Sequence, residues 1–87
     1  MQYDVIIKPS AEKQLDKLPK TVRIRVIEKL EELCHDPRPE GAVKLKGAED
    51  LWRIRIGVYR VIYQILDDRL LVFVLRVSHR KDIYKGM

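Results

Sequence analysis

Three arginines alternate along two neighbouring segments in the C-terminal half of the chain. Arg53 and Arg55 stand two residues apart in the run LWRIRI, and Arg60 stands in the run VYRVIYQIL that follows. Because side chains alternate between the two faces of a β-strand, residues two apart share a face. A guanidinium group binds phosphate oxygens through two parallel hydrogen bonds. The spacing therefore predicts an arginine-lined surface that holds the phosphates of a polyanion.

A two-residue turn at Gly57-Val58 joins these two strands, since glycine at the first turn position favours a type II′ hairpin. This turn pairs Ile56 with Tyr59 and Arg55 with Arg60, and the apolar sides of both strands then coincide. Like charges placed directly opposite each other destabilise a sheet by tenths to about 1 kcal/mol. The alternative to a phosphate-binding surface is a sheet face exposed to solvent, on which arginine simply replaces lysine or threonine.

A third strand, LLVFVLRV, follows a turn at residues 67–69. A three-residue turn pairs Leu66 with Leu70 and puts Arg76 and Arg80 on the face of the other arginines, whereas a two-residue turn puts them on the opposite face. We prefer the three-residue turn because it sends the apolar residues of the strand to the core. Those residues are Leu71, Phe73, Leu75 and Val77.

The elements that must position these arginines follow from periodicity and from Gly and Pro signals. Ser10 is the expected N-cap of the first helix. The order is β-αα-βββ, which predicts an α+β fold in which two helices cover one face of an about four-stranded, largely antiparallel sheet, in a single domain spanning 1–87. The expected strands are 1–8, 51–56, 58–66 and 70–77, the helices are 11–18 and 20–35, and the loop is 36–50 with a short extended piece at 43–45.

Composition narrows the class of protein. The chain has 87 residues, a net charge of +5 and a single cysteine, Cys34, so it has no intrachain disulfide. No apolar run approaches the ~20 residues of a membrane span, and the start lacks the layout of a secretion signal. These features predict a cytoplasmic protein. The positive charge favours a polyanionic partner, although a charge of this size is also ordinary for a soluble surface.

Familiar catalytic motifs are absent from the sequence. There is no Walker loop, GxGxxG, CxxC or HExxH, and the two histidines, His35 and His79, lie on different predicted elements. A ribonuclease built on paired imidazoles is therefore not indicated. Cys34, Trp52 and Tyr63 lie on apolar faces and are expected to be packing residues.

The run WRIRIGVYRVIYQILDDRLLVFVLRVSHRKDIY, with KLKG before it, resembles the RelE branch of the RelE/ParE toxin superfamily. The HRxxxY ending favours RelE over ParE, whose members poison DNA gyrase. The resemblance implies the toxin of a type II toxin–antitoxin pair, which enters the ribosomal A site and cuts mRNA. It implies attack by the 2′-hydroxyl, a 2′,3′-cyclic phosphate product, no metal or other cofactor, and an acidic antitoxin as partner.

Carried over by position, the resemblance assigns catalytic and RNA-binding roles to basic and aromatic residues. The family pattern has lysines at the first two catalytic positions, and arginine cannot act as a general base near neutral pH because its pKa exceeds 12. We therefore expect these two arginines to orient mRNA and stabilise negative charge. The catalytic residues are Arg53, Arg55, Arg60, Arg80 and Tyr84, and the RNA-binding residues are Lys44, Lys46, Arg76, His79 and Lys81.

Three alternatives remain at this stage. The chain is a ParE-like gyrase inhibitor that cuts nothing, a nucleic-acid-binding module without catalysis, or a family member that lost activity through the Lys-to-Arg changes and acts with its antitoxin as a repressor. Cleavage of ribosome-bound mRNA would distinguish a RelE-type nuclease from all three alternatives.

Overall fold

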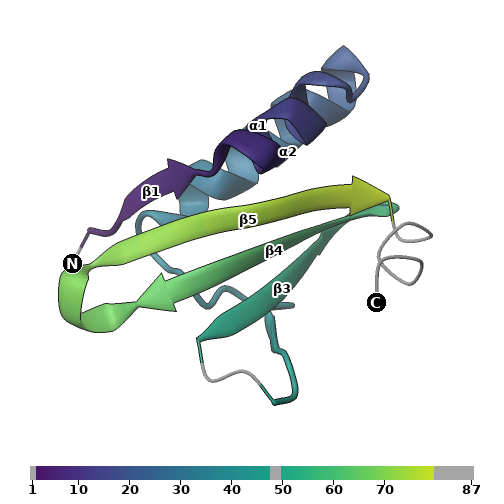
Figure 1. The fold of residues 1–87 in the computed structure, drawn as a ribbon. Helices are drawn as coiled ribbons and strands as arrows, with labels where there is room; N and C mark the ends of the chain where they lie inside the picture. The colour runs from purple at the N-terminus through teal and green to yellow at the C-terminus, as the bar shows by residue number, and fades with distance from the viewer. Residues whose placement is uncertain (1, 48–49, 80–87) are drawn as a thin grey trace.

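A computed structural model describes residues 2–47 and 50–79 of the chain. Two helices pack against a five-stranded mixed sheet (Figure 1). The strand order in the sheet is β1-β5-β4-β3-β2. The elements are β1 (Asp4–Ile7), α1 (Pro9–Asp16), α2 (Lys20–Leu33), β2 (Val43–Lys44), β3 (Leu51–Ile56), β4 (Tyr59–Leu66), a 3-10 turn (Asp67–Arg69) and β5 (Leu71–His79). This is the predicted α+β order with one additional strand.

The added strand is β2, which forms within the predicted loop and pairs antiparallel with β3. The expected four-stranded sheet thus has five strands. At the other edge, β1 pairs in parallel with β5, from Asp4 opposite Leu71 to Ile7 opposite Val74. Beyond Val74, β5 continues to His79 without β1 beside it.

The first helix begins earlier than the sequence indicated. Pro9 occupies its first turn, and Lys8 is the N-cap residue with extended backbone and no side-chain capping bond. The prediction of Ser10 as N-cap is therefore wrong, because a proline, whose missing N–H costs nothing at the first helical position, starts the helix instead. The second helix ends at Leu33, two residues before the predicted boundary.

The β3–β4 hairpin has the predicted register. Ile56 lies opposite Tyr59 and Arg55 lies opposite Arg60. Gly57 has a φ of 61°, a conformation that glycine adopts without steric strain. The turn chemistry and the alternation of the two strands were therefore sufficient to predict this pairing.

The β4–β5 register differs from the prediction in two places. Leu66 pairs with Leu71 rather than with Leu70, because the turn contains four residues and Leu70 adopts a left-handed φ of 52°. Further along, Tyr63 pairs with Val74 while Ile62 pairs with Arg76. One residue, Leu75, is thus extra in β5 and forms a β-bulge.

The turn and the bulge change the face of β5 that is buried. Val72, Val74 and Val77 are the buried residues of this strand, at 0%, 0% and 2% exposure. The prediction that Leu71, Phe73 and Leu75 enter the core is wrong, and only Val77 is confirmed. After the bulge, the side chains of β5 again alternate as predicted. Arg76 therefore faces the same side as the β3 and β4 arginines.

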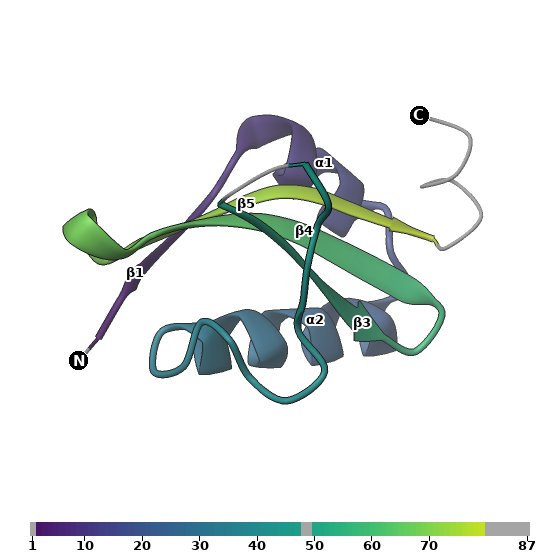
Figure 2. The same ribbon diagram turned by 90° about the horizontal axis from the view of Figure 1, so that it is seen from below.

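One hydrophobic cluster forms the core, and it joins buried residues of both helices to one face of the sheet. Leu15 and Leu30 represent the helices in it, and Tyr63, at 0% exposure, lies at its centre on β4. Trp52 is partly buried at its margin. Figure 2 shows α1 beside β5, the strand near one edge of the sheet, and α2 nearer to β3. None of the helices in the described ranges is both long and apolar enough to span a membrane.

Candidate nucleic-acid interface

Four arginines share the sheet face opposite the hydrophobic cluster. Arg55 pairs with Arg60, and Arg60 pairs in turn with Ser78 on β5. Ile62 lies between Arg53 and Arg76 in the adjacent row. Residues directly opposite in a ladder point to the same side. We call this surface the arginine face, defined by Arg53, Arg55, Arg60 and Arg76.

The four side chains differ in exposure. Arg55 is exposed, Arg53 and Arg76 are half-buried, and Arg60 is only 6% exposed. A buried side chain has few accessible rotamers, so Arg60 has less conformational freedom to lose when a ligand binds. The arrangement therefore combines one buried guanidinium with more exposed ones around it.

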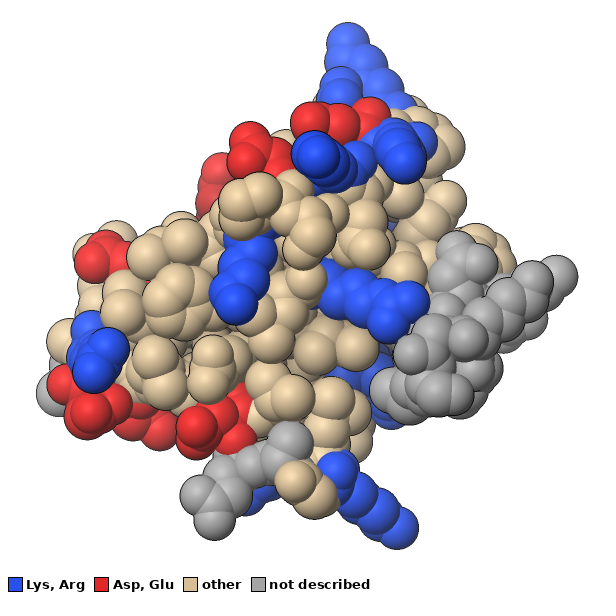
Figure 3. Space-filling view, in the orientation of Figure 1, with Lys and Arg blue, Asp and Glu red and all other residues tan. Residues whose placement is uncertain are grey.

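The strands that carry the arginine face have an excess of positive side chains. The strands β3, β4 and β5 contain no Asp or Glu. Ion pairs between described residues join Lys29 to Glu32 and Arg38 to Asp67, and neither includes Arg53 or Arg55. Figure 3 shows Lys and Arg over the middle of the sheet and toward the end of β5, while acidic side chains lie mainly around the β4–β5 turn and over the helices.

Arg55 also borders a cleft that the sequence did not reveal. Helix α2 contributes two cations and two acids to the walls of this cleft, and the hairpin contributes Arg55 and Gly57. The α2 residues are Arg25, Glu28, Lys29 and Glu32. No ion pair within 4.0 Å joins Arg55 to either carboxylate among the described residues. The two acids of α2 are offset by the two cations beside them, so Arg55 gives this corner a net positive charge.

Ser78 is a polar residue that the sequence analysis did not select. It is 8% exposed and lies directly opposite Arg60, and its Oγ makes no hydrogen bond in the described structure. A buried hydroxyl without a partner is uncommon, because its desolvation is then not compensated. The register that places Arg76 on the arginine face was the signal that could have identified Ser78, two residues later.

The other predicted RNA contacts lie elsewhere. Lys44 pairs with Trp52, so it is on the helix side of the sheet, and Lys46 is exposed in the loop after β2. His79 pairs with Tyr59 on the helix side as well, where the two rings meet edge to face at 5.5 Å between centroids. The structure thus gathers Arg53, Arg55, Arg60 and Arg76, but not these three. Arg80, Lys81 and Tyr84 lie outside the described residues.

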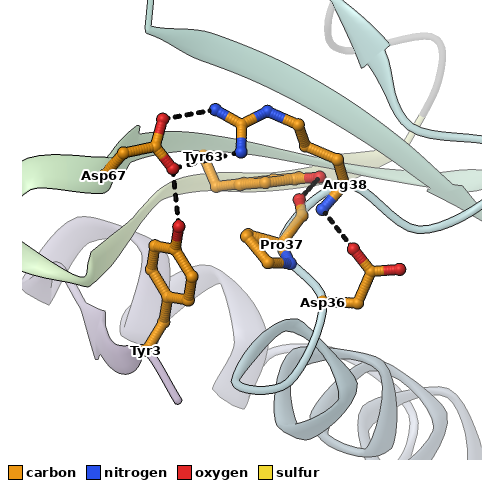
Figure 4. Close-up of polar contacts among 6 residues, drawn as sticks. All are labelled: Tyr3, Asp36, Pro37, Arg38, Tyr63 and Asp67. Carbon is orange, nitrogen blue, oxygen red and sulfur yellow. Dashed lines mark hydrogen bonds and ion pairs between the residues drawn. The ribbon is translucent and has the colours of Figure 1, made fainter. Parts of the chain in front are cut away.

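A second polar cluster lies at the opposite end of the sheet and joins three distant segments (Figure 4). The two terminal guanidinium nitrogens of Arg38 donate to Asp67, at 3.1 and 2.7 Å, and the Tyr3 hydroxyl donates to the same carboxylate at 2.6 Å. The hydrogen bonds from Arg38 and then Tyr3 lower the pKa of Asp67 to about 2. The same bond to Asp67 raises the pKa of Tyr3.

The loop that carries Arg38 is fixed by two further contacts. The buried Tyr63 hydroxyl donates to the carbonyl oxygen of Pro37 at 2.8 Å, and burial raises the pKa of Tyr63 to about 12. The Arg38 guanidinium carbon lies 5.2 Å from the centroid of the Trp52 ring, within cation–π range. This end of the molecule uses its arginine for internal contacts.

In the described ranges, no three His, Cys, Asp or Glu side chains come together in a way that could hold a metal ion. The arginine face itself presents guanidinium groups of different exposure with an adjacent hydroxyl, that of Ser78. Such groups bind phosphates and stabilise negative charge that develops on them.

Comparisons with known proteins support the family resemblance that the sequence motifs indicated. Residues 5–84 match the model of the family described as ParE toxin of type II toxin–antitoxin system, parDE. The mRNA interferase toxin RelE of Escherichia coli K12 is 37% identical over 83 residues, which cover 93% of this chain and 86% of that protein.

Two solved structures are similar over nearly the whole chain. A free E. coli RelE variant has a TM-score of 0.81 at 34% identity, covering 98% of this chain and 93% of its own. The archaeal RelE of a RelE–RelB complex from Pyrococcus horikoshii has a TM-score of 0.83 at 34% identity, with 92% and 97% covered.

The chain therefore belongs to the RelE/ParE superfamily of type II toxin–antitoxin toxins. Its similarity to RelE proteins in both sequence and structure places it in the RelE branch, as the hairpin and the HRKDIY segment predicted.

Proposed function

We propose that this protein is a toxin that cleaves mRNA in the ribosomal A site. The observation that carries the proposal is the register of β3, β4 and β5, with Arg55 opposite Arg60 and Arg53 and Arg76 in the adjacent row. A row of guanidinium groups on strands without acids is suited to a phosphodiester backbone. The relative named mRNA interferase toxin RelE, 37% identical, supports this reading.

In the proposed reaction, the 2′-oxygen of one nucleotide loses its proton and bonds to the adjacent phosphorus. The bond from phosphorus to the 5′-oxygen breaks, and that oxygen takes up a proton. The products are a 2′,3′-cyclic phosphate and a 5′-hydroxyl, and the route needs no metal. Negative charge grows on the phosphate oxygens and the leaving oxygen in the transition state, which is where guanidinium groups act.

The roles follow from position. Arg60 holds the scissile phosphate from its fixed, buried place, while Arg53 and Arg55 orient the RNA and stabilise charge. We assign Tyr84 to orienting or deprotonating the 2′-hydroxyl and Arg80 to neutralising the leaving oxygen, as the family resemblance implies. Because His79 lies on the helix side of the sheet, the proposal gives it no proton-transfer role.

The proposed protein partner is an acidic antitoxin. The relative from P. horikoshii was solved with RelB bound, and the net charge of this chain is +5. An acidic partner that covers the arginine face would block RNA by competing for the same cations. Expression of the toxin in the cytoplasm should arrest growth, and co-expression of an adjacent frame that encodes such a partner should restore it.

A ParE-like action is the second candidate, because the matching family model is that of ParE. It predicts inhibition of DNA gyrase and no change in RNA. The two candidates share the fold, so only the target distinguishes them.

The deciding experiment incubates the purified protein with ribosomes that carry a defined mRNA and a filled P site. The cut positions are mapped by primer extension, and supercoiling by gyrase is measured in parallel with the same preparation. We expect a cut within the A-site codon, a cyclic phosphate end and unchanged gyrase activity. Intact mRNA together with inhibited gyrase would replace this proposal with the ParE reading.

A further inference from the structure

A cleft of about 300 Å³ opens between β5 and the C-terminal end of α1. It lies where β5 continues past Val74 without β1 beside it. The side chain of Gln14 closes part of this free edge, because its Oε1 accepts a hydrogen bond from the Val77 backbone N–H at 2.7 Å. The cleft walls include Gln14, Lys17, Leu18, Tyr59, Ser78 and His79.

Two aromatic rings form one side of the cleft. Tyr59 and His79 are a cross-strand pair whose ring planes meet at 80°, with 5.5 Å between centroids. Both residues are half-buried, so neither is enclosed in the core. Aromatic side chains in such a position provide surfaces on which an unstacked base can stack.

The polar groups of the cleft are suited to an anion with hydrogen-bonding edges. Lys17 is exposed and supplies a positive charge at the rim. The Oε1 of Gln14 is engaged, which leaves its Nε2 as a donor. No Asp or Glu from the described ranges lines this cleft, whereas Glu28 and Glu32 line the cleft beside α2. An anionic ligand is therefore favoured here over the α2 cleft.

The cleft is continuous with the arginine face. Arg76 and Ser78 line the cleft, and the register also places both beside the other arginines. The Ser78 Oγ, buried and without a hydrogen bond in the described structure, lies at this boundary. A nucleotide chain that crosses the β5 edge would have a phosphate on one side and a base on the other.

We propose that this cleft binds a nucleobase of the RNA whose neighbouring phosphate lies on the arginine face. The base stacks on the face of one ring of the edge-to-face Tyr59–His79 pair, and Lys17 binds the phosphate that follows it. This inference deepens the proposed function and rests on it. It adds a base-binding subsite on the helix side of the sheet to a phosphate-binding surface on the other side.

The test is an NMR titration of the isotope-labelled full chain with each nucleoside 5′-monophosphate, with ribose 5-phosphate and with inorganic phosphate. We expect the nucleotides to shift the ring signals of Tyr59 and His79 and the side-chain amide of Gln14. Ribose 5-phosphate and inorganic phosphate should shift the signals of the arginine face and of Lys17, but not the ring signals of Tyr59 and His79. Equal effects of all three ligand types would overturn the proposal, because the base would then contribute nothing.

Variants sharpen this test. Tyr59→Leu should weaken nucleotide binding about tenfold or more by removing a stacking surface, and His79→Phe, which keeps a ring, should weaken it less than His79→Leu. Since Tyr59 contacts its neighbours within the sheet, Lys17→Glu provides a surface substitution that does not endanger folding. Lys13→Glu is its matched control, because Lys13 is exposed in the last turn of α1, one turn before the C-cap residue Lys17, and does not line the cleft.

The outcome can be separated from that of the proposed function by measuring mRNA cleavage with the same variants. Cleavage by the wild type, with nucleotide binding unaffected by both Tyr59→Leu and Lys17→Glu, overturns the base subsite and leaves the nuclease. Nucleotide binding in the cleft without any cleavage by the wild type supports the subsite and removes the nuclease.

Discussion

The two ends of the sheet use arginine in opposite ways. At the β4–β5 turn, Arg38 donates two hydrogen bonds to Asp67 and lies over the Trp52 ring. At the other end, Arg55 lies directly opposite Arg60, and the three long strands provide no carboxylate. The first arrangement satisfies the guanidinium within the fold. The second places two like charges directly opposite each other, and that pairing is by itself unfavourable.

The groups that surround an arginine thus indicate whether its role is structural or functional. An arginine with a carboxylate and an aromatic ring beside it contributes to the position of its own loop. Arginines concentrated on one sheet face instead create a potential that an external anion lowers. The comparison predicts that substitutions at the arginine face change activity more than stability, and that substitutions around Asp67 do the reverse.

The largest expected effect is that of Arg60→Ala. Cleavage of ribosome-bound mRNA should fall at least ~10²-fold, because the fixed guanidinium that holds the scissile phosphate is lost. Arg60→Lys should retain part of the activity, since it keeps the charge but loses the two-pronged contact. Arg69→Ala, an exposed arginine in the β4–β5 turn, is the matched control and should cleave at the wild-type rate.

Because Arg60 is buried, circular dichroism and thermal unfolding must accompany this measurement. A folded Arg60→Ala protein with wild-type cleavage would remove Arg60 from the site. Arg80→Ala is expected to lower cleavage by a similar factor, as the family resemblance implies.

A smaller effect, about tenfold on cleavage, is expected for Arg55→Gln. The free energy of unfolding should stay the same or rise by up to ~1 kcal/mol, because one of two directly opposed cations is removed. Across the α2 cleft, attraction from two acids works against this gain and repulsion from two cations adds to it, and salt screens all of these interactions. The acids are Glu28 and Glu32, and the cations are Arg25 and Lys29. Urea unfolding at low and high salt measures the balance. A clear loss of stability would show that Arg55 belongs to the structural class with Arg38.

Tyr63→Phe tests the other end of the comparison. It removes the hydrogen bond to the Pro37 carbonyl and should lower the free energy of unfolding by ~1 kcal/mol without changing cleavage. In the wild type the raised pKa of about 12 means that folded Tyr63 keeps its proton at pH values where the unfolded chain loses it. The contribution of Tyr63 to the free energy of unfolding is therefore complete below about pH 10 and is lost between about pH 10 and 12. Urea unfolding across this range should show a weaker decline in Tyr63→Phe.

Local signals were enough to predict the hairpin and most of the arginine face. Gly57 and the strict alternation around it fix the β3–β4 register, and hence the Arg55–Arg60 pair. The apolar run of β5 carries no such information, since both of its faces are hydrophobic in sequence. Nothing in it marks Leu75 as the bulge residue. The predicted face of Arg76 was correct because the longer turn and the bulge shift the register by two residues in total.

Contacts between distant segments were beyond sequence reasoning. Asp67 is 64 residues from Tyr3 and 29 from Arg38, and no spacing rule links positions so far apart. The parallel pairing of β1 with β5 is equally non-local, and with it the free edge of β5 where the α1 cleft opens. For the same reason, the alternation of β4 identified Tyr59 as an inward residue but not its contact with His79.

The smallest expected effect belongs to Asp67→Asn, because both members of the Arg38–Asp67 ion pair are partly exposed and water screens it. The folded-state pKa of about 2 lies below the ordinary value of 3.8, so the unfolded chain binds a proton first as pH falls. The contribution of Asp67 to stability is thus complete above about pH 4 and is lost as pH falls toward 2. Thermal unfolding between pH 5 and 2 should decline less steeply in Asp67→Asn than in the wild type, while mRNA cleavage at neutral pH stays unchanged. Reduced cleavage by this variant would mean that the two ends of the sheet are coupled, and the distinction between a structural and a functional arginine cluster would no longer hold.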